Sequence, residues 1–419
     1  MLLKYKPLKH TVSKTIRAQV MFLLTLTSSL LFPLTSQAES KDKKYDVAAI
    51  VWPSYHPDPR AKIFWPDGIG EWQTVMSNKP KFKGHEQPRF PSWGYVNEAD
   101  PYVAQMEIEA ATDHGVNVFI FDWYWYDGMP FLEGHLNDGF LKAKNNEKMK
   151  FYLMWANHNV GRAWDKRGSD DVFSKKDKSR IWNGGIDREE FEKICHRFIE
   201  KYFSKPNYYK IDGKPVFMIF SLNELIEGLG GVEQTKDALD WFKQTVVKAG
   251  YKGLELQYSM RMNGKRQIKI DGKSVGEEKA LIEKFEIDSL THYVFPQMTG
   301  VNRDYNHVVK DVEKLWYEVS ESYEAKYYPQ VSVGWDNSPR AKEWYGVIMK
   351  NSNPKNFEAA LRKAKKYVDA HPDQAPLINI NSWNEWTESS YLMPDTTHGY
   401  GYLEAVKRVF KDNEKNNKE

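Results

Sequence analysis

The sequence has almost no cysteine: Cys195 is the only one among 419 residues. A single thiol cannot form a disulfide within the chain, so packing alone must hold the fold together. Cys195 lies in an apolar pattern formed by Phe191, Ile194, Phe198 and Tyr202, whose three- and four-residue spacing is typical of a helix. We therefore expect Cys195 to be a buried core residue and not a nucleophile.

Several short signatures of enzyme chemistry are also missing. The chain has no His-Glu-x-x-His of zinc proteases and no phosphate-binding loop of nucleotidases. Gly68-Ile69-Gly70 is only a fragment of a dinucleotide-binding fingerprint. The sequence therefore predicts neither a metal site nor a cofactor.

The chain has little net charge. Its formal charge is +3, but the five basic residues Lys4, Lys6, Lys9, Lys14 and Arg17 occur before position 38 with no acid among them, so the remainder carries about −2. A nearly neutral body has no electrostatic field to attract nucleic acid. We expect no nucleic-acid partner.

The basic N-terminus leads into an apolar run over residues 20–34 and then into Ser36-Gln37-Ala38. This order of basic, apolar and small residues is typical of a secretory signal. The apolar run is short and rich in Ser and Thr for a membrane span, which is the alternative. We predict a signal peptide over 1–38 cleaved near Ala38, a catalytic domain over 39–412 and a flexible tail over 413–419. The expected location is secreted or periplasmic, without stable membrane insertion after cleavage.

Short apolar runs alternate with amphipathic helical patterns over the rest of the chain. The runs are rich in β-branched and aromatic residues, as parallel strands buried on both faces should be. They cover residues 46–52, 116–122, 150–155, 215–220, 254–259, 289–295, 327–333 and 376–382. The helical patterns cover residues 99–110, 131–145, 233–249, 276–286, 306–321, 357–368 and 399–411.

Eight strands alternating with helices predict an α/β fold, a (β/α)8 TIM barrel in a single domain with long βα loops at 53–98 and 156–188. A doubly wound sheet is the alternative, but it would need a Gly-rich turn after the first strand, where the chain has Pro-Ser-Tyr-His-Pro. Polar residues such as Asp122, Asp336 and Asn384 follow the strands, at the end where barrels place active sites.

Two glutamates follow the last strand in the segment Trp383-Asn384-Glu385-Trp386-Thr387-Glu388. On a helical turn, side chains three residues apart lie about 5–6 Å from each other at Cβ. Two such carboxylates cannot both ionise freely, so one pKa should rise and separate an acid from a base, as glycoside hydrolysis requires. The alternative is a helix N-terminus whose dipole stabilises acids. The flanking tryptophans and Asn384 favour catalysis.

Eight stretches in order resemble glycoside hydrolase family 99 and the family-99-like, WbsX-like proteins. They are Trp-Pro-Ser-Tyr-His-Pro at 52–57, Gly-Glu-Trp at 70–72, Lys-Gly-His-Glu-Gln-Pro at 83–88, Trp-Ala-Asn-His-Asn at 155–159, Asp-Gly-Lys-Pro at 212–215, Val-Gly-Trp-Asp-Asn at 333–337, Asn-Ser-Trp-Asn-Glu-Trp-Thr-Glu at 381–388 and Gly-Tyr-Gly-Tyr-Leu at 399–403. The resemblance implies a (β/α)8 barrel and metal-independent, retaining cleavage of α-mannoside linkages, often inside a chain. It also implies that Glu385 draws the proton from the substrate's own 2-hydroxyl and that Glu388 protonates the leaving group.

The strand-end positions and the resemblance together give a set of expected sugar-binding residues, for each of which structural support of a loop is the alternative. The set is His56, Glu71, Trp72, Trp125, Asn157, His158, Tyr293, Trp335, Asn384 and Trp386.

The chain departs from the family-99 endomannosidases, which have His-Glu-Gly where this chain has Thr387-Glu388-Ser389. WbsX-like relatives more often carry Ala-Glu-Gly there, followed by a proline-acid pair like Pro394-Asp395. The sequence is therefore nearer to these relatives, which leaves the sugar and linkage open. The predicted function is an exported hydrolase of an oligo- or polysaccharide; a WbsX-like polysaccharide-assembling transferase and a non-catalytic sugar-binding barrel are the alternatives.

Overall fold

The structure is a computed structural model that describes residues 45–161, 164, 180–341 and 347–412. These residues belong to one compact unit, Lys44–Glu419. The predicted signal peptide and the predicted C-terminal tail lie outside the described residues. Among the helices that are described, none is both long enough and apolar enough to cross a bilayer.

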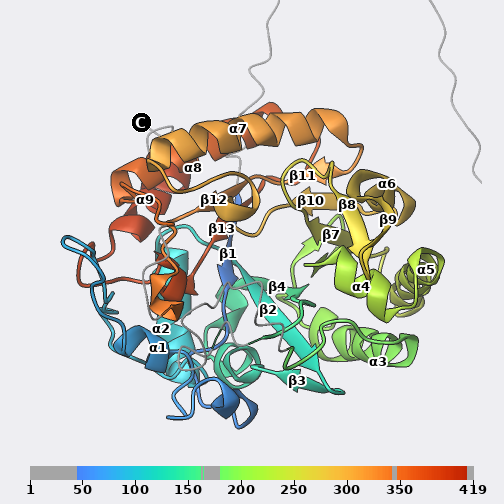
Figure 1. Ribbon diagram of the computed structural model, residues 1–419, viewed down its shortest axis with the longest axis horizontal. Coiled ribbons are helices and arrows are strands. Elements are labelled where there is room, and N and C mark those ends of the chain that lie inside the picture. Colours follow the sequence, from blue (N-terminus) through green and yellow to red (C-terminus); the bar gives the residue numbers. More distant parts are fainter. Residues whose placement is uncertain (1–44, 162–163, 165–179, 342–346, 413–419) are drawn as a thin grey trace, which may run out of the picture. The chain divides into compact units, whose positions relative to one another are not determined.

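A curled parallel sheet forms the centre of the unit, with helices around it (Figure 1). Neighbouring strands follow the order β11-β10-β7-β6-β4-β2-β1-β13-β12. The strands of this path are β1 (Asp46–Val51), β2 (Val118–Tyr126), β4 (Lys150–Trp155), β6 (Lys214–Ile219), β7 (Glu255–Ser259), β10 (Ser289–Thr291), β11 (Lys326–Tyr327), β12 (Gln330–Ser332) and β13 (Leu377–Asn381).

The sheet closes into a barrel because β11 and β12 are two pieces of one strand, separated by Tyr328 and Pro329. The backbone N–H of Tyr328 donates to Leu290 on β10, and the N–H of Asn379 on β13 donates to Pro329, both at 2.9 Å. Proline has no N–H to donate, which interrupts the strand at this point. Counted as one strand, β11 and β12 bring the total to eight, so the predicted (β/α)8 barrel is confirmed and the doubly wound alternative is excluded.

Helices lie between successive barrel strands and cover the outside of the sheet (Figure 1). They are α1 (Trp72–Met76), α2 (Pro101–Asp113), α3 (Arg188–Phe198), α4 (Leu222–Gly228), α5 (Val232–Lys248), α6 (Glu278–Lys284), α7 (Tyr305–Ser322), α8 (Pro354–Ala370) and α9 (Gly401–Phe410). Cys195 is fully buried on α3, as its apolar pattern predicted. Short strands outside the barrel are β3 (Met129–Phe131), β5 (Lys210–Ile211), β8 (Gln267–Ile270), β9 (Lys273–Glu277), β14 (Asn384–Glu385) and β15 (Ser390–Tyr391).

The helical prediction over 131–145 was wrong in kind. The chain there forms a π-helical turn over His135–Gly139 and a 3-10 turn over Phe140–Lys142 instead of a regular α-helix. Two glycines explain the irregularity, because a Cβ on Gly134 would lie 2.6 Å from the His56 ring and one on Gly139 would lie 2.2 Å from a backbone oxygen of Glu98. Both contacts are too short for any other residue, so the backbone follows its neighbours and not its helical propensity.

Candidate active site

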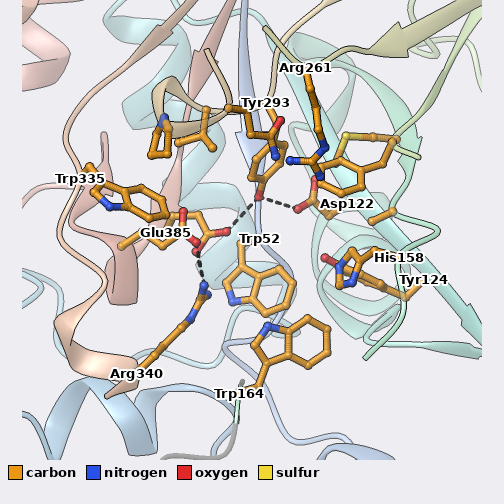
Figure 2. Close-up of a pocket in the computed structure, with 17 residues that line it drawn as sticks. Trp52, Asp122, Tyr124, His158, Trp164, Arg261, Tyr293, Trp335, Arg340 and Glu385 are labelled. Atoms are coloured by element: carbon orange, nitrogen blue, oxygen red, sulfur yellow. Dashed lines mark hydrogen bonds and ion pairs between the residues drawn. The ribbon is translucent and has the colours of Figure 1, made fainter. Parts of the chain in front are cut away.

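A cavity of about 320 Å³ opens at the carboxyl ends of the barrel strands (Figure 2). This is the face where barrel enzymes build their active sites from βα loops. The cavity is lined by Trp52, Asp122, Tyr124, Met154, Ala156, His158, Trp164, Phe220, Arg261, Tyr293, Val294, Pro296, Gln297, Trp335, Arg340, Glu385 and Glu388. Aromatic rings and charged groups therefore share one partly enclosed space.

Glu385 and Glu388 both face this cavity. Glu385 is on β14, Glu388 ends the 3-10 turn Trp386–Glu388, and both are largely buried. The guanidinium of Arg340 donates from Nη2 to Oε2 of Glu385 at 3.1 Å and from Nη1 to Oε1 of Glu388 at 2.7 Å. Oε2 of Glu388 has no hydrogen-bond partner among the described residues. One carboxyl oxygen is thus available to a ligand.

Arg340 holds three carboxylates at once, because its Nε also donates to Oε1 of Glu71 at 3.0 Å. Burial opposes the positive charge, but Glu71, Glu385 and Glu388 outweigh it and raise the pKa of Arg340. The sequence analysis did not identify Arg340. It follows Ser338 and Pro339 in the loop after β12, where no spacing or motif marks it, and only the closed barrel brings it to the glutamates.

The two glutamates are electrostatically coupled. Burial raises the pKa of Glu385, and the charge of Glu388 raises it further, while Arg340 opposes the rise. Burial also raises the pKa of Glu388, again against the effect of Arg340. Two buried carboxyl groups with raised pKa values can hold one proton between them near neutral pH, which is the condition for paired acid and base roles.

Tyr293 links Glu385 to Asp122, another acid on the cavity wall. The Tyr293 oxygen lies 2.9 Å from Oε1 of Glu385 and 2.9 Å from Oδ2 of Asp122 (Figure 2). A hydroxyl has one proton to donate, so both contacts are favourable only if one carboxyl is protonated and donates to the tyrosine oxygen. Burial raises the pKa of Asp122 well above its usual range. Burial raises the pKa of Glu385 as well, so either carboxyl can carry this proton.

His158 and Trp335, both expected sugar-binding residues, also line the cavity. Nδ1 of His158 lies 3.0 Å from the backbone oxygen of Asn159, and burial lowers the pKa of the ring. A neutral imidazole that donates from Nδ1 presents Nε2 as an acceptor for a sugar hydroxyl. Trp335 lies between this cavity and a second one of about 590 Å³, since it lines both.

The other expected sugar-binding residues are not among the described residues that line the cavity. Trp125 is on the opposite face of β2 from Asp122 and Tyr124, because side chains alternate along a strand. It stacks on Trp123, with ring centroids 5.8 Å apart, on the side covered by α3. Its predicted place in a sugar subsite does not agree with this position, and Tyr124 lines the cavity instead.

Trp72 and Trp386 also lie behind the cavity wall. The indole N–H of Trp72 donates to Val96, and Trp386 stacks on Tyr391 with ring centroids 3.9 Å apart. Both rings are therefore used for packing.

The remaining expected residues form hydrogen bonds that hold neighbouring loops and strands in place. Structural support of this kind was the alternative to sugar binding for each of them. Glu71 accepts the indole N–H of Trp52 at 2.6 Å, and Asn384 bonds both the N–H and the C=O of Trp52 at 2.8 Å. Asn157 makes the same two-way contact with the backbone of Ser221, and Nδ1 of His56 contacts Pro57.

The sequence of this chain matches a known protein family. The profile of the family described as glycosyltransferase WbsX matches residues 47–406. The chain belongs to the WbsX family. Two proteins named uncharacterized protein WxcX, from two strains of Xanthomonas campestris pv. campestris, are 26% identical to it over 367 residues, which is 87% of this chain and 49% of theirs. The chain spans about half the length of these curated relatives. Membership of the family indicates a carbohydrate-active protein.

Solved structures share the fold of this WbsX-family chain. A glycoside hydrolase-like protein superposes with a TM-score of 0.54 at 16% identity, covering 88% of this chain and 94% of that one. The family-99 endo-alpha-mannosidase from Bacteroides thetaiotaomicron gives a TM-score of 0.53 at 14% identity, covering 89% and 98%. At these identities the likeness shows the barrel fold alone.

Behind the segment that carries Glu385 and Glu388 lies a fully buried cluster of Glu98, His135 and Glu107. His135 contacts Glu98 through Nδ1 at 3.1 Å and Glu107 through Nε2 at 2.9 Å. The cluster holds this segment, since Asn384 donates to Glu98 at 3.0 Å and the indole of Trp383 donates to Glu107 at 3.2 Å. The three residues are close enough to ligate a metal. However, both imidazole nitrogens already face carboxylates, so the arrangement fits an imidazolium between two acids better than a metal centre.

The charge of this cluster makes stability depend on pH. Burial opposes the charge of His135, but Glu107 and Glu98 outweigh it and raise its pKa to about 10, while burial raises the pKa of Glu98 to about 7. A raised histidine pKa contributes stability that is complete below about 6.5 and lost as the pH rises through 10. We expect His135→Gln to lower the free energy of unfolding by about 3–5 kcal/mol at pH 7 and by much less at pH 10.

Denaturant unfolding of the wild type and His135→Gln at pH 7 and pH 10 measures this difference. His114→Gln is the control, because His114 pairs with Glu404 at a partly exposed surface. A His135→Gln deficit that stays the same at both pH values would exclude a charged imidazole in the cluster.

Proposed function

We propose that this chain is a retaining glycoside hydrolase that cleaves bonds within an oligo- or polysaccharide, with Glu385 as base and Glu388 as acid. The main support is the geometry around Arg340, which holds both carboxylates on one wall of the cavity. The unpartnered oxygen of Glu388 and the Tyr293-bound oxygen of Glu385 give the two groups different surroundings. Different surroundings are what separate an acid from a base.

In the proposed reaction, Glu385 accepts the proton of the substrate's 2-hydroxyl while that oxygen attacks the anomeric carbon. The bond to the leaving oxygen breaks, and Glu388 gives its proton to that oxygen. Water then attacks the anomeric carbon of the anhydro-sugar and passes a proton to Glu388, while the 2-oxygen takes its proton back from Glu385. The nucleophile is already part of the substrate, so little orientation entropy is lost.

The side chains around the glutamates support this assignment. With the proton on Asp122, the Tyr293 hydroxyl would donate to Glu385 and stabilise its ionised form, as a base requires. Trp52 and Trp335 offer flat apolar rings to the faces of sugar units.

An α-mannoside is the first substrate to test, on the resemblance to the family-99 endomannosidases. The family-99 enzymes have glycine where this chain has Ser389. Ser389 has a φ of 52°, in the left-handed region that favours glycine. Ser389 keeps the turn that the glycine of its relatives would make, so the two glutamates can keep their places. Thr387 donates to Glu71 at 3.1 Å and not to the cavity, so it affects the sugar indirectly.

The family description favours a second candidate, a transferase that uses a nucleotide-sugar donor. The cavity lining includes three acids, Asp122, Glu385 and Glu388, and Arg340 is already bound to two of them. Arg261 is the one other arginine of the described lining, so the several charges of a diphosphate would face an excess of acids, and we favour the hydrolase.

The test is digestion of a panel of mannans and other microbial and algal glycans by the wild type, Glu385→Gln and Glu388→Gln. We expect soluble fragments from at least one glycan with the wild type only, and NMR of the first product should show the anomeric configuration of the substrate. Fragments of inverted configuration, or release that persists in both variants, would contradict the proposal. Transfer of sugar from a nucleotide donor, without glycan cleavage, would favour the second candidate.

Removing the Tyr293 hydroxyl should change the pH profile. In Tyr293→Phe, Glu385 loses a hydrogen bond that stabilises its ionised form, so its pKa should rise by about one unit. The acidic limb of kcat/KM should then move to higher pH by about one unit, with an approximately tenfold loss on that limb. Tyr124→Phe is the control, since Tyr124 lines the same cavity but its hydroxyl bonds to neither glutamate. An unchanged limb in Tyr293→Phe would remove Tyr293 from this role.

We also propose that the chain is exported, because its N-terminal segment has the basic and apolar order of a secretory signal. Cell fractionation and N-terminal sequencing of the mature chain test it, with cleavage near Ala38 expected. A full-length chain in the cytoplasm would contradict export without affecting the chemistry.

A further inference from the structure

Arg261 differs from the other described arginines in the hydrogen bonds of its side chain. It follows β7 and lines the catalytic cavity, yet its guanidinium has no hydrogen-bond acceptor and no ion-pair partner within the described part of the chain. Every other arginine that the structure describes donates at least one side-chain hydrogen bond. Five N–H donors therefore face a sugar-sized space without an acceptor.

The surroundings of Arg261 do not compensate its charge. One face of the guanidinium lies over the Phe220 ring, 5.4 Å from its centroid. Burial and the neighbouring cation Arg266 lower the pKa of Arg261, although Tyr258, Glu278 and Glu224 oppose this. Glu278 is bound to Arg266 at 3.0 Å, and Glu224 accepts from Asn159 and Ser221. A charge that a ligand removes from water needs a partner. An acceptor that arrives with the ligand would complete the pairing.

The position of Arg261 separates it from the reacting groups. In Figure 2 Arg261 reaches the cavity from one side, whereas Arg340 reaches Glu385 from the opposite side. Arg340 is occupied by three carboxylates and organises the acid and base. Arg261 is therefore the cavity cation that is open to substrate.

We propose that the natural substrate carries an anionic substituent, a carboxylate or a sulfate ester, and that Arg261 binds it in the catalytic cavity. The inference rests on the proposed hydrolase function and names its substrate class. A planar guanidinium matches both oxyanions through two parallel N–H donors, which an ammonium cannot reproduce. Arg261 is thus a specificity residue, and neutral mannans should be poorer ligands than acidic glycans.

The test measures binding of the full chain to glycan pairs by affinity electrophoresis. Each pair is an acidic polysaccharide and its neutral counterpart, uronans before and after carboxyl reduction and sulfated glycans before and after desulfation. We expect at least one acidic glycan to retard the wild type, its neutral counterpart to bind at least tenfold more weakly, and Arg261→Met to lose that difference. Arg261→Lys should recover only part of it. Arg362→Met, which removes an exposed arginine of α8, should behave as the wild type.

The outcomes separate this inference from the proposed function. Equal binding of charged and neutral partners, retardation by no acidic glycan, or unchanged discrimination in Arg261→Met would overturn the role of Arg261. Cleavage of a neutral glycan that depends on Glu388 but not on Arg261 would do the same and leave the hydrolase intact. Charge-dependent binding through Arg261 without cleavage would support the inference and count against the hydrolase. UDP and GDP form a separate arm, and Arg261-dependent binding of either would overturn a glycan anion as the ligand.

Discussion

Glu388→Gln should lower kcat/KM by about 10³-fold on a natural glycan but by less than about tenfold on an aryl glycoside with a leaving group of low pKa. The reason is that Glu388 is proposed to protonate the leaving oxygen, and a good leaving group needs no proton. Synthetic glycosides of the sugar found in the glycan panel, with a series of phenol leaving groups, provide the measurement. The dependence of rate on leaving-group pKa should be steep in the variant and shallow in the wild type.

Glu385→Gln is the matched comparison, because the reaction needs the proposed base whatever the leaving group of the substrate is. It should lower the rate on natural and activated substrates by similar factors. The result matters because in the ligand-free cavity Arg340 lies closer to Glu388 than to Glu385, 2.7 Å against 3.1 Å, and so favours the negative charge on Glu388. If activated substrates rescue Glu385→Gln and not Glu388→Gln, the two roles are reversed.

Arg340→Met should destabilise the folded protein strongly. The substitution removes the only described cation that is paired with Glu71, Glu385 and Glu388 and leaves three buried acids without a counter-charge. Breaking a buried pair by removing one partner costs about 3–5 kcal/mol, and we expect a loss of this size in the free energy of unfolding at pH 8.

The pH dependence of this loss follows from the carboxylates. Without Arg340 the folded pKa values of Glu385 and Glu388 rise further above the unfolded value, and a raised carboxyl pKa contributes stability at low pH that is lost as the pH rises. The deficit of Arg340→Met should therefore be smaller at pH 5 than at pH 8 in denaturant unfolding. Arg362→Met provides a surface control near zero. A deficit that grows toward pH 5 would show that the three acids are not the cause.

The barrel could be predicted from the sequence because its signal is local. Strands such as β2 and β13 are buried on both faces, so each reads as a short apolar run without reference to its neighbours. The pair Glu385 and Glu388 could be predicted for the same reason, since three residues of spacing on a turn keep two side chains together. The raised pKa values of both acids agree with that expectation.

The rest of the site depends on contacts between distant segments. Arg340 reaches Glu71 across 269 residues of sequence, and no local pattern could indicate this pairing. The position of Trp125, in contrast, could have been predicted from the sequence. Asp122 is a polar residue in an apolar strand and marks the side of the strand that faces the cavity. Side-chain alternation from Asp122 selects Tyr124 and rejects Trp125.

The hydrogen bonds of the Asn384 side chain to the Trp52 backbone join the beginning of the barrel to its end, 332 residues later. Glu71 comes from the first loop, Arg340 from the seventh, and Glu385 and Glu388 from the eighth. Only a segment that runs from the first loop to the eighth contains the complete set, so these side chains meet only when the ring closes. Recovery of catalysis during refolding should accordingly report the meeting of the two ends and lag behind the gain of helical signal.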